Sequence, residues 1–219
     1  MLRARVVVFV CCLGLVGLAG CSSSKPTSVA VAPTTTSTTV DLLNNLQLTI
    51  SDQVPAGFIE EPLGTDGEGP LDLAGTAQSI NPMHIAAVEM ILQQYNFVRG
   101  YQRVWVDQAT GKSLVIRVQL MGSAFQAMEY YNVQSDADRL GGQSKKFLTP
   151  TLDLASGFTS SFTDKNGARS GQFVDLARGP LFFHISLVGA RGSVSQADIV
   201  TMAQSQSTES AAQGYTSGS

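Results

Sequence analysis

The chain is poor in cysteine and histidine, the side chains on which metal sites and many enzymes depend. Of its 219 residues, three are cysteines and two are histidines. Neither His84 nor His184 has cysteines or an acidic cluster at the spacing of metal ligands, so the sequence predicts no metal site and no cofactor. Cys11 and Cys12 lie in an N-terminal apolar segment, and its removal would leave Cys21 with no disulfide partner. We therefore expect the fold to be stabilised by burial of apolar side chains.

The sequence also lacks the motifs of several common catalytic and binding classes. It contains no G-x-S-x-G pattern of a nucleophile elbow. The glycines from Gly64 to Gly69 are not followed by the Lys and Ser or Thr of a P-loop. The formal net charge is −3, and a chain without concentrated Lys and Arg is a poor binder of nucleic acid. The sequence thus predicts that the protein is not an enzyme and does not bind nucleic acid.

An apolar run from Val6 to Leu18 follows two arginines and ends at small residues. It has about the length of the apolar part of a signal peptide and is shorter than the roughly 20 residues that span a bilayer. The residues from Leu18 to Cys21, LAGC, resemble the lipobox of bacterial lipoproteins. That resemblance implies a signal peptide over residues 1–20, cleavage before Cys21 and diacylation of its sulfur. The mature protein would then be extracytoplasmic and lipid-anchored to the cell membrane, or to the outer membrane of a two-membrane source.

The rest of the sequence divides into a tether, one domain and a tail. Residues 21–40 are rich in Ser and Thr and contain too few large apolar side chains to fold. Residues 41–207 are long enough for a single domain with a substantial core. Residues 208–219 are small and polar, and are predicted to form a disordered tail.

Periodicity within the domain predicts strands and helices in a repeated order. The first set of predicted elements is a strand at Leu46–Ile50, a loop at Val54–Pro70, a helix from Asn81–Pro82 to about Tyr95, strands at Phe97–Val106 and Ser113–Met121, and a helix capped by Ser123. The second set is a weak strand at Phe158–Phe162, strands at Gly171–Ala177 and Leu181–Val188, and a helix capped by Ser195 and Asp198.

Two units of hairpin followed by helix favour an α+β fold, in which helices cover an antiparallel sheet. This order of elements, although it includes no diagnostic motif, is similar to the Mog1/PsbP-like sandwich of some actinobacterial lipoproteins. The resemblance covers residues 41–207 and implies a sandwich of one sheet with helices.

Alternation along the first hairpin predicts a polar and aromatic sheet face. If Val98, Val104 and Val106 share a buried face with the apolar residues of the second strand, the opposite face gathers Arg99, Tyr101, Arg103, Trp105, Arg117 and Gln119. Arginine offers planar donors for carboxylate or phosphate, and the rings offer stacking surface, so these six residues are the candidate ligand-binding set. The alternative is that the arginines lie over the aromatic rings and pair with acids on a covering element.

The second hairpin places an acid opposite a histidine. A tight turn at Gly179–Pro180 sets Asp175 directly across from His184. Ser186 lies on the same face, but residues two apart on a strand are separated by nearly 7 Å, which argues against a catalytic triad. We therefore interpret Asp175 and His184 as a structural pair.

Taken together, these features favour a lipid-anchored binding or interaction module of the cell envelope. Its predicted ligand is an anionic or amphipathic envelope molecule on the Arg and aromatic face, and its predicted contact with the membrane is the lipid on Cys21. A structural or adaptor lipoprotein that binds a protein partner is the first alternative. An envelope hydrolase, which would depend on His184, is the second.

Overall fold

The computed structural model describes residues 45–140, 144–165 and 167–215. The predicted signal peptide, Cys21 and the tether lie outside these residues. Within them, no helix is both long and apolar enough to cross a bilayer.

The described domain is built on one antiparallel sheet. Its strands follow the order β1-β3-β4-β8-β7-β6-β5, and β2 also pairs with β3. The long strands are β3 (Phe97–Asp107), β4 (Lys112–Met121), β6 (Ala155–Asp164), β7 (Gly167–Arg178) and β8 (Leu181–Ala190). The short strands are β1 (Ile59–Glu60), β2 (Gly69–Leu71) and β5 (Lys145–Phe147). The two predicted hairpins are present and are joined by the pairing of β4 with β8.

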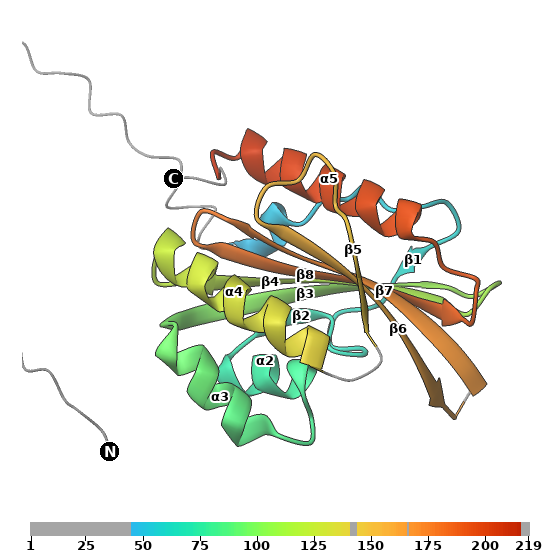
Figure 1. Cartoon of the computed structure of the whole chain (residues 1–219), viewed down its shortest axis with the longest axis horizontal. Helices are drawn as coiled ribbons and strands as arrows, with labels where there is room; N and C mark the ends of the chain where they lie inside the picture. The colour runs from blue at the N-terminus through green and yellow to red at the C-terminus, as the bar shows by residue number, and fades with distance from the viewer. Residues whose placement is uncertain (1–44, 141–143, 166, 216–219) are drawn as a thin grey trace, which may run out of the picture. The chain divides into compact units, whose positions relative to one another are not determined.

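Helices cover both faces of the sheet, which confirms the predicted α+β class (Figure 1). Helix α5 (Gln196–Ala212) lies on one face, together with the short 3-10 helix η1 (Leu46–Thr49). Helices α2 (Leu73–Ile80), α3 (Ile85–Gln94) and α4 (Ala124–Leu140) lie on the other. Each hairpin is followed by a helix, as predicted: β3-β4 by α4 and β7-β8 by α5.

Each face of the sheet carries its own hydrophobic core. Under α5, Ile199 and Met202 pack against strand residues that include Ile116, Phe183 and Ile185. Under the other three helices, the buried residues are Ala77, Leu92, Met121, Ala127, Tyr130, Tyr131, Ala177 and Phe182. Because both faces are buried, the central strands have apolar residues on both sides, and simple alternation is weak.

The predicted helix caps are observed. The Gln126 N–H donates to Ser123 Oγ at 3.2 Å, and the Asp198 N–H donates to Ser195 Oγ at 3.1 Å. These side chains satisfy backbone donors that the first turn leaves without helical partners.

Three predicted elements near the N-terminal end of the domain are wrong in type or extent. Residues 46–49 form η1 and not a strand, because Leu46 and Ile50 are buried while Leu48 is 56% exposed, which fits one helical turn. The predicted loop of residues 54–70 contains β1 and the start of β2. The helix expected from Asn81 begins only after His84, and α2 precedes it.

The predicted disordered tail is also wrong over its first residues, because α5 continues to Ala212. The inner face of this helix includes Ala203, Gln206 and Ser210, all fully buried. Gln206 holds the N-terminal segment in place: its Oε1 accepts from the Ser51 N–H at 3.0 Å, and its Nε2 donates to Thr49 O at 2.5 Å. Small and polar residues thus form a packed helix face that hydropathy does not indicate.

Candidate ligand-binding site

The structure divides the predicted Arg and aromatic set between the two faces of the sheet. Tyr101 pairs with Val118, Arg103 with Ile116 and Trp105 with Leu114. Directly paired residues in an antiparallel sheet share a face. The predicted set therefore separates into Arg99, Tyr101, Arg103 and Trp105 on the α5 side and Arg117 and Gln119 on the α2 side.

The prediction of a shared face is wrong because the register of this hairpin differs by one residue from the assumed one. Val104 pairs with Val115 and Val106 with Ser113, so the valines do not share a face with Leu114 and Ile116. A slip of one residue exchanges the two faces of a strand. Burial of both faces removes the alternation that would have fixed the register from the sequence.

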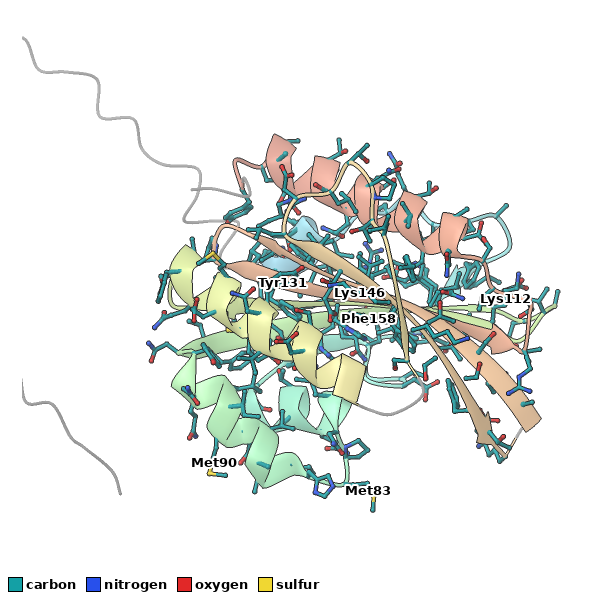
Figure 2. All side chains as sticks on the ribbon, in the orientation of Figure 1. Met83, Met90, Lys112, Tyr131, Lys146 and Phe158 are labelled. Atoms are coloured by element: carbon teal, nitrogen blue, oxygen red, sulfur yellow. The ribbon has the colours of Figure 1, made fainter. Side chains whose placement is uncertain are left out.

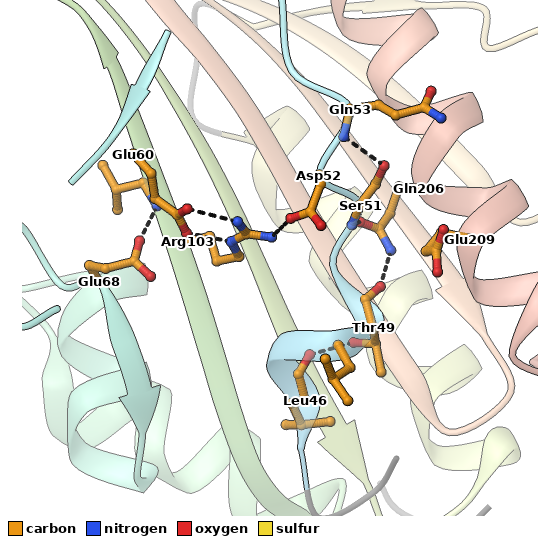
Figure 3. Close-up of polar contacts among 12 residues, drawn as sticks. Leu46, Thr49, Ser51, Asp52, Gln53, Glu60, Glu68, Arg103, Gln206 and Glu209 are labelled. Carbon is orange, nitrogen blue, oxygen red and sulfur yellow. Dashed lines mark hydrogen bonds and ion pairs between the residues drawn. The ribbon is translucent and has the colours of Figure 1, made fainter. Parts of the chain in front are cut away.

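Arg103 is buried on the α5 side, where it is held in an ionic network with Glu60 and Asp52 (Figure 3). Its Nε and Nη2 donate to the two carboxylate oxygens of Glu60 at 2.6 and 2.8 Å, and its Nη1 donates to Asp52. The guanidinium lies 4.7 Å from the ring centroid of Trp105. Burial lowers the pKa of Arg103, but the hydrogen bonds to Glu60 and Asp52 outweigh it and raise the pKa overall. This is the arrangement of the alternative interpretation, in which an arginine covers an aromatic ring and pairs with acids.

Glu68, at the edge of this network, should make the fold sensitive to pH. Burial and the nearby Glu60 raise the pKa of the Glu68 carboxyl above 4.5, while the hydrogen bond from the Val104 N–H and the charge of Arg103 oppose the rise. The folded protein therefore binds this proton more tightly than the unfolded chain. The resulting stabilisation is complete below the ordinary pKa and is lost as the pH rises through the raised value.

A Glu68→Gln variant should therefore be more stable than the wild type at pH 7, because its amide oxygen still accepts from Val104 and carries no charge. The difference should shrink by pH 4, where the wild-type carboxyl is protonated. Urea unfolding at the two pH values measures the difference in stability between the variant and the wild type. Lower stability of the variant at pH 7 would show that the charged carboxylate is favoured in the fold.

The opposite face of the sheet carries a polar row that crosses five strands. Gln102 of β3 pairs with Arg117 of β4, Arg117 with His184 of β8, His184 with Asp175 of β7, and Asp175 with Ser156 of β6. Gln102, Arg117, Asp175 and Ser156 are all buried, and the His184 side chain is 17% exposed. The row brings together residues that are distant in the sequence, because β4 and β8 are neighbours.

Hydrogen bonds fix the centre of this row. His184 Nδ1 lies 2.6 Å from Asp175 Oδ1, in the predicted cross-strand position. Because a carboxylate only accepts, Nδ1 carries the hydrogen and Nε2 is the ring nitrogen turned away from Asp175. Arg117 Nη1 donates to Ser79 Oγ of α2 at 3.1 Å, and that hydroxyl donates to Thr76 O at 2.8 Å. These contacts link α2 to strand β4.

The two ends of the row are also anchored. Tyr131, labelled in Figure 2, contacts Ser156 through hydroxyl oxygens 2.7 Å apart and so connects α4 to β6. At the other end, Gln102 Nε2 donates to the carbonyl oxygens of Asp66 and Gly67 at 3.4 and 3.3 Å. Gly67 has a φ of +83°, and a Cβ there would lie 2.7 Å from Gln102 Nε2. A side chain at this position would therefore strain the backbone and push the Gln102 amide away from the loop.

An open hollow of about 520 Å³ lies over the Gln102, Arg117 and His184 part of this row, beside α2. Its volume falls within the range of about 300–1,000 Å³ that is typical of small-molecule sites. Its described lining consists of Asp66, Gly67, Leu71, Gly75, Gln78, Ser79, Pro82, Gln102, Val115, Arg117, His184 and Ser186. The hollow thus has a polar floor and a partly apolar wall.

The described residues of this hollow do not have the arrangement of a metal site. Within the described ranges, no group of three or more His, Cys, Asp or Glu could hold a metal ion. Ser186 lies two positions along β8 from His184 and pairs with Val115 and Phe173, so its Cα is roughly 7 Å from that of His184. The spacing that argued against a Ser-His-Asp triad in the sequence is therefore present in the fold.

Sequence reasoning found Arg117, Asp175 and His184 but missed Gln102 and the whole of α2. A signal for α2 was present: Asp72 Oδ1 accepts from the Gly75 N–H at 2.7 Å and caps the helix. Its apolar residues are small and few, so its periodicity is weak. The cross-strand pairing of Gln102 with Arg117 could not be seen in the sequence, because it depends on the register of the first hairpin.

Comparisons with known proteins identify no family. No protein-family model matches the sequence, and no curated protein matches it. Among solved structures, the chain is similar to the extracellular domain of PknH from Mycobacterium tuberculosis. The two are 7% identical, the similarity covers 75% of this chain and 80% of that chain, and the TM-score is 0.44.

Proposed function

We propose that this protein is an extracytoplasmic binding module that holds a small acidic molecule in the hollow beside α2. The observation that carries the proposal is that Arg117 and His184 lie side by side in the floor of a hollow large enough for such a molecule. An arginine in a mostly buried floor is well suited to recognise a carboxylate or phosphate, since its planar donors form paired, charge-assisted hydrogen bonds.

The remaining lining fits a molecule with a carbon skeleton as well as a charge. Ser79, Gln102 and Ser186 supply hydroxyl and amide groups around Arg117. Leu71, Pro82 and Val115 supply apolar surface beside them. Binding sites for small molecules commonly combine a few oriented polar groups with such an apolar wall.

The location belongs to the same proposal and is supported by the sequence. The lipobox-like LAGC ending at Cys21 follows an apolar segment with the length of a signal peptide. A diacylated Cys21 would hold the binding module at the membrane surface. The protein would then bind its ligand outside the cytoplasm, as a carrier or a sensor.

Glycerol 3-phosphate, which has a phosphate on a short carbon skeleton, serves as the probe ligand. Replacing Arg117 with glutamine should weaken its binding by about 10–100-fold, because hydrogen bonds to charged groups contribute about 1.5–3 kcal/mol each. Isothermal titration of the full mature chain in non-ionic detergent measures the change. Arg117→Lys, which keeps the charge but loses the paired donors, should give a smaller loss.

Arg191→Gln is the matched control, since Arg191 is exposed and lies outside the described lining of the hollow. It should bind as the wild type does. Equal affinity of the Arg117→Gln and wild-type proteins would contradict the proposal, as would an equal loss in Arg191→Gln.

A second candidate function, docking to a protein partner, is favoured by the outward face of α3. Met90 of α3 and Met83, just before its start, extend away from this part of the domain in Figure 2 and are 65% and 82% exposed. Ala86 and Ala87 lie between them and are also exposed. An exposed apolar helix face of this kind is typical of adaptor surfaces.

A further inference from the structure

Gln119 is a fully buried amide with no hydrogen-bond partner in the described part of the fold. Its exposure is 0%, and neither Nε2 nor Oε1 has a partner among the described residues. The hydroxyl of Thr76 in α2, also 0% exposed, shares this property. Buried polar groups are nearly always hydrogen-bonded, because leaving them without partners costs free energy. Two such groups in one region call for a physical explanation.

Both groups lie on elements that also line the hollow, although neither belongs to its lining. Gln119 is two residues from Arg117 on the same face of β4, and it pairs with Gly100 on β3 and Phe182 on β8. Thr76 lies over Gly100, where an added Cβ would be 3.1 Å from Thr76 Oγ1. Helix α2, which carries Thr76, also forms a wall of the hollow. The uncompensated groups are therefore in the layer between α2 and the sheet.

We infer that the hollow continues beneath α2 as a second, polar subsite formed by Gln119 and Thr76. This inference rests on the proposed function and specifies its ligand. An amide and a hydroxyl each offer a donor and an acceptor, so the matching group on a ligand is a hydroxyl. Gln119 and Arg117 are two residues apart on one face of β4, so their Cα atoms are about 7 Å apart and one small ligand can contact both side chains. The ligand class is a phosphorylated polyol.

Entry to the subsite requires α2 to move, and the contacts of Arg117 provide a way. Arg117 donates to Ser79 Oγ and so ties α2 to β4. A phosphate at Arg117 would replace the Ser79 hydroxyl as its partner and release this tie. The fully buried residues of α2 are the small residues Thr76 and Ala77. An outward shift of the helix would also loosen Leu73 and Ile80, which are only partly buried against the core.

The test is titration of the full mature chain in detergent with glycerol 3-phosphate and with inorganic phosphate, before and after Gln119→Met. Methionine has nearly the volume of glutamine but no hydrogen-bonding amide. We expect the wild type to bind glycerol 3-phosphate at least tenfold more tightly than phosphate. In Gln119→Met this ratio should fall to near one, phosphate affinity should persist, and the melting temperature should rise because the uncompensated amide is gone.

Gln172→Met is the matched control, since Gln172 is a buried glutamine that has a partner: Thr159 Oγ1 donates to its Oε1 at 2.7 Å. This variant should lose stability and keep the ratio. An unchanged ratio in Gln119→Met would overturn the inference, as would a lower melting temperature.

The proposed function itself fails in a different way, namely if phosphate binding does not depend on Arg117. A second arm with phosphatidylglycerol in mixed micelles separates the two sources of a phosphorylated polyol. If phosphatidylglycerol competes with glycerol 3-phosphate, the ligand is a lipid headgroup. If it does not compete, the ligand is a free metabolite.

Discussion

Replacing Phe182 with alanine should lower the free energy of unfolding by about 4 kcal/mol, in the range of large-to-small substitutions of buried aromatic residues. Phe182 is 0% exposed. Its ring meets the ring of Tyr130 on α4 edge to face, with centroids 4.9 Å apart and an interplanar angle of 83°. The substitution removes this contact and leaves a cavity where α4 packs on the sheet.

Urea unfolding monitored by circular dichroism measures the effect. Phe162→Ala is the control, because Phe162 lies on β6 and is 39% exposed, and we expect it to change the stability by about 0.5 kcal/mol or less. A loss below about 1.5 kcal/mol in Phe182→Ala would show that the second core is loosely packed.

Replacing Arg103 with alanine should destabilise the fold by about 2 kcal/mol. Loss of one partner from a buried ion pair typically costs about 3–5 kcal/mol, but the acids of this pair are partly solvated: the side chains of Asp52 and Glu60 are 85% and 37% exposed. We therefore expect a value below that range. The cost has two sources, the carboxylate of Glu60 left without its cation and the lost stacking on Trp105.

Thermal unfolding should show a decrease in the melting temperature of about 4–8 °C, since 1 kcal/mol corresponds to about 2–4 °C in a domain of this size. Asp52→Asn, which changes the exposed end of the network, should stay within about 0.5 kcal/mol of the wild type. Binding of glycerol 3-phosphate should be unchanged in Arg103→Ala. Loss of binding with full stability would restore Arg103 to the ligand-binding set.

The two hairpins show what the sequence can and cannot specify about this sheet. The second hairpin has a tight turn at Gly179–Pro180, which fixes the register, and the predicted pairing of Asp175 with His184 is present. The first hairpin has a four-residue loop between Asp107 and Lys112. With a longer loop and apolar residues on both faces, neither turn geometry nor alternation determines which arginines share a side.

The hollow beside α2 could not be predicted from either hairpin alone. It depends on the pairing of β4 with β8, which places Arg117 next to His184. It also depends on α2, whose small residues give a weak periodic signal. The fold class followed from local patterns, whereas the site follows from contacts between distant segments.

Native mass spectrometry of the mature chain, purified in mild detergent from its own host, is the most direct test of the binding proposal. We predict a bound mass that corresponds to a phosphorylated or carboxylated small molecule and that is absent from the Arg117→Gln variant but present in Arg191→Gln. A mass excess that persists in Arg117→Gln, or a bare chain in repeated wild-type preparations, would contradict the proposal. A bare chain would favour the exposed face of α3 as the functional surface.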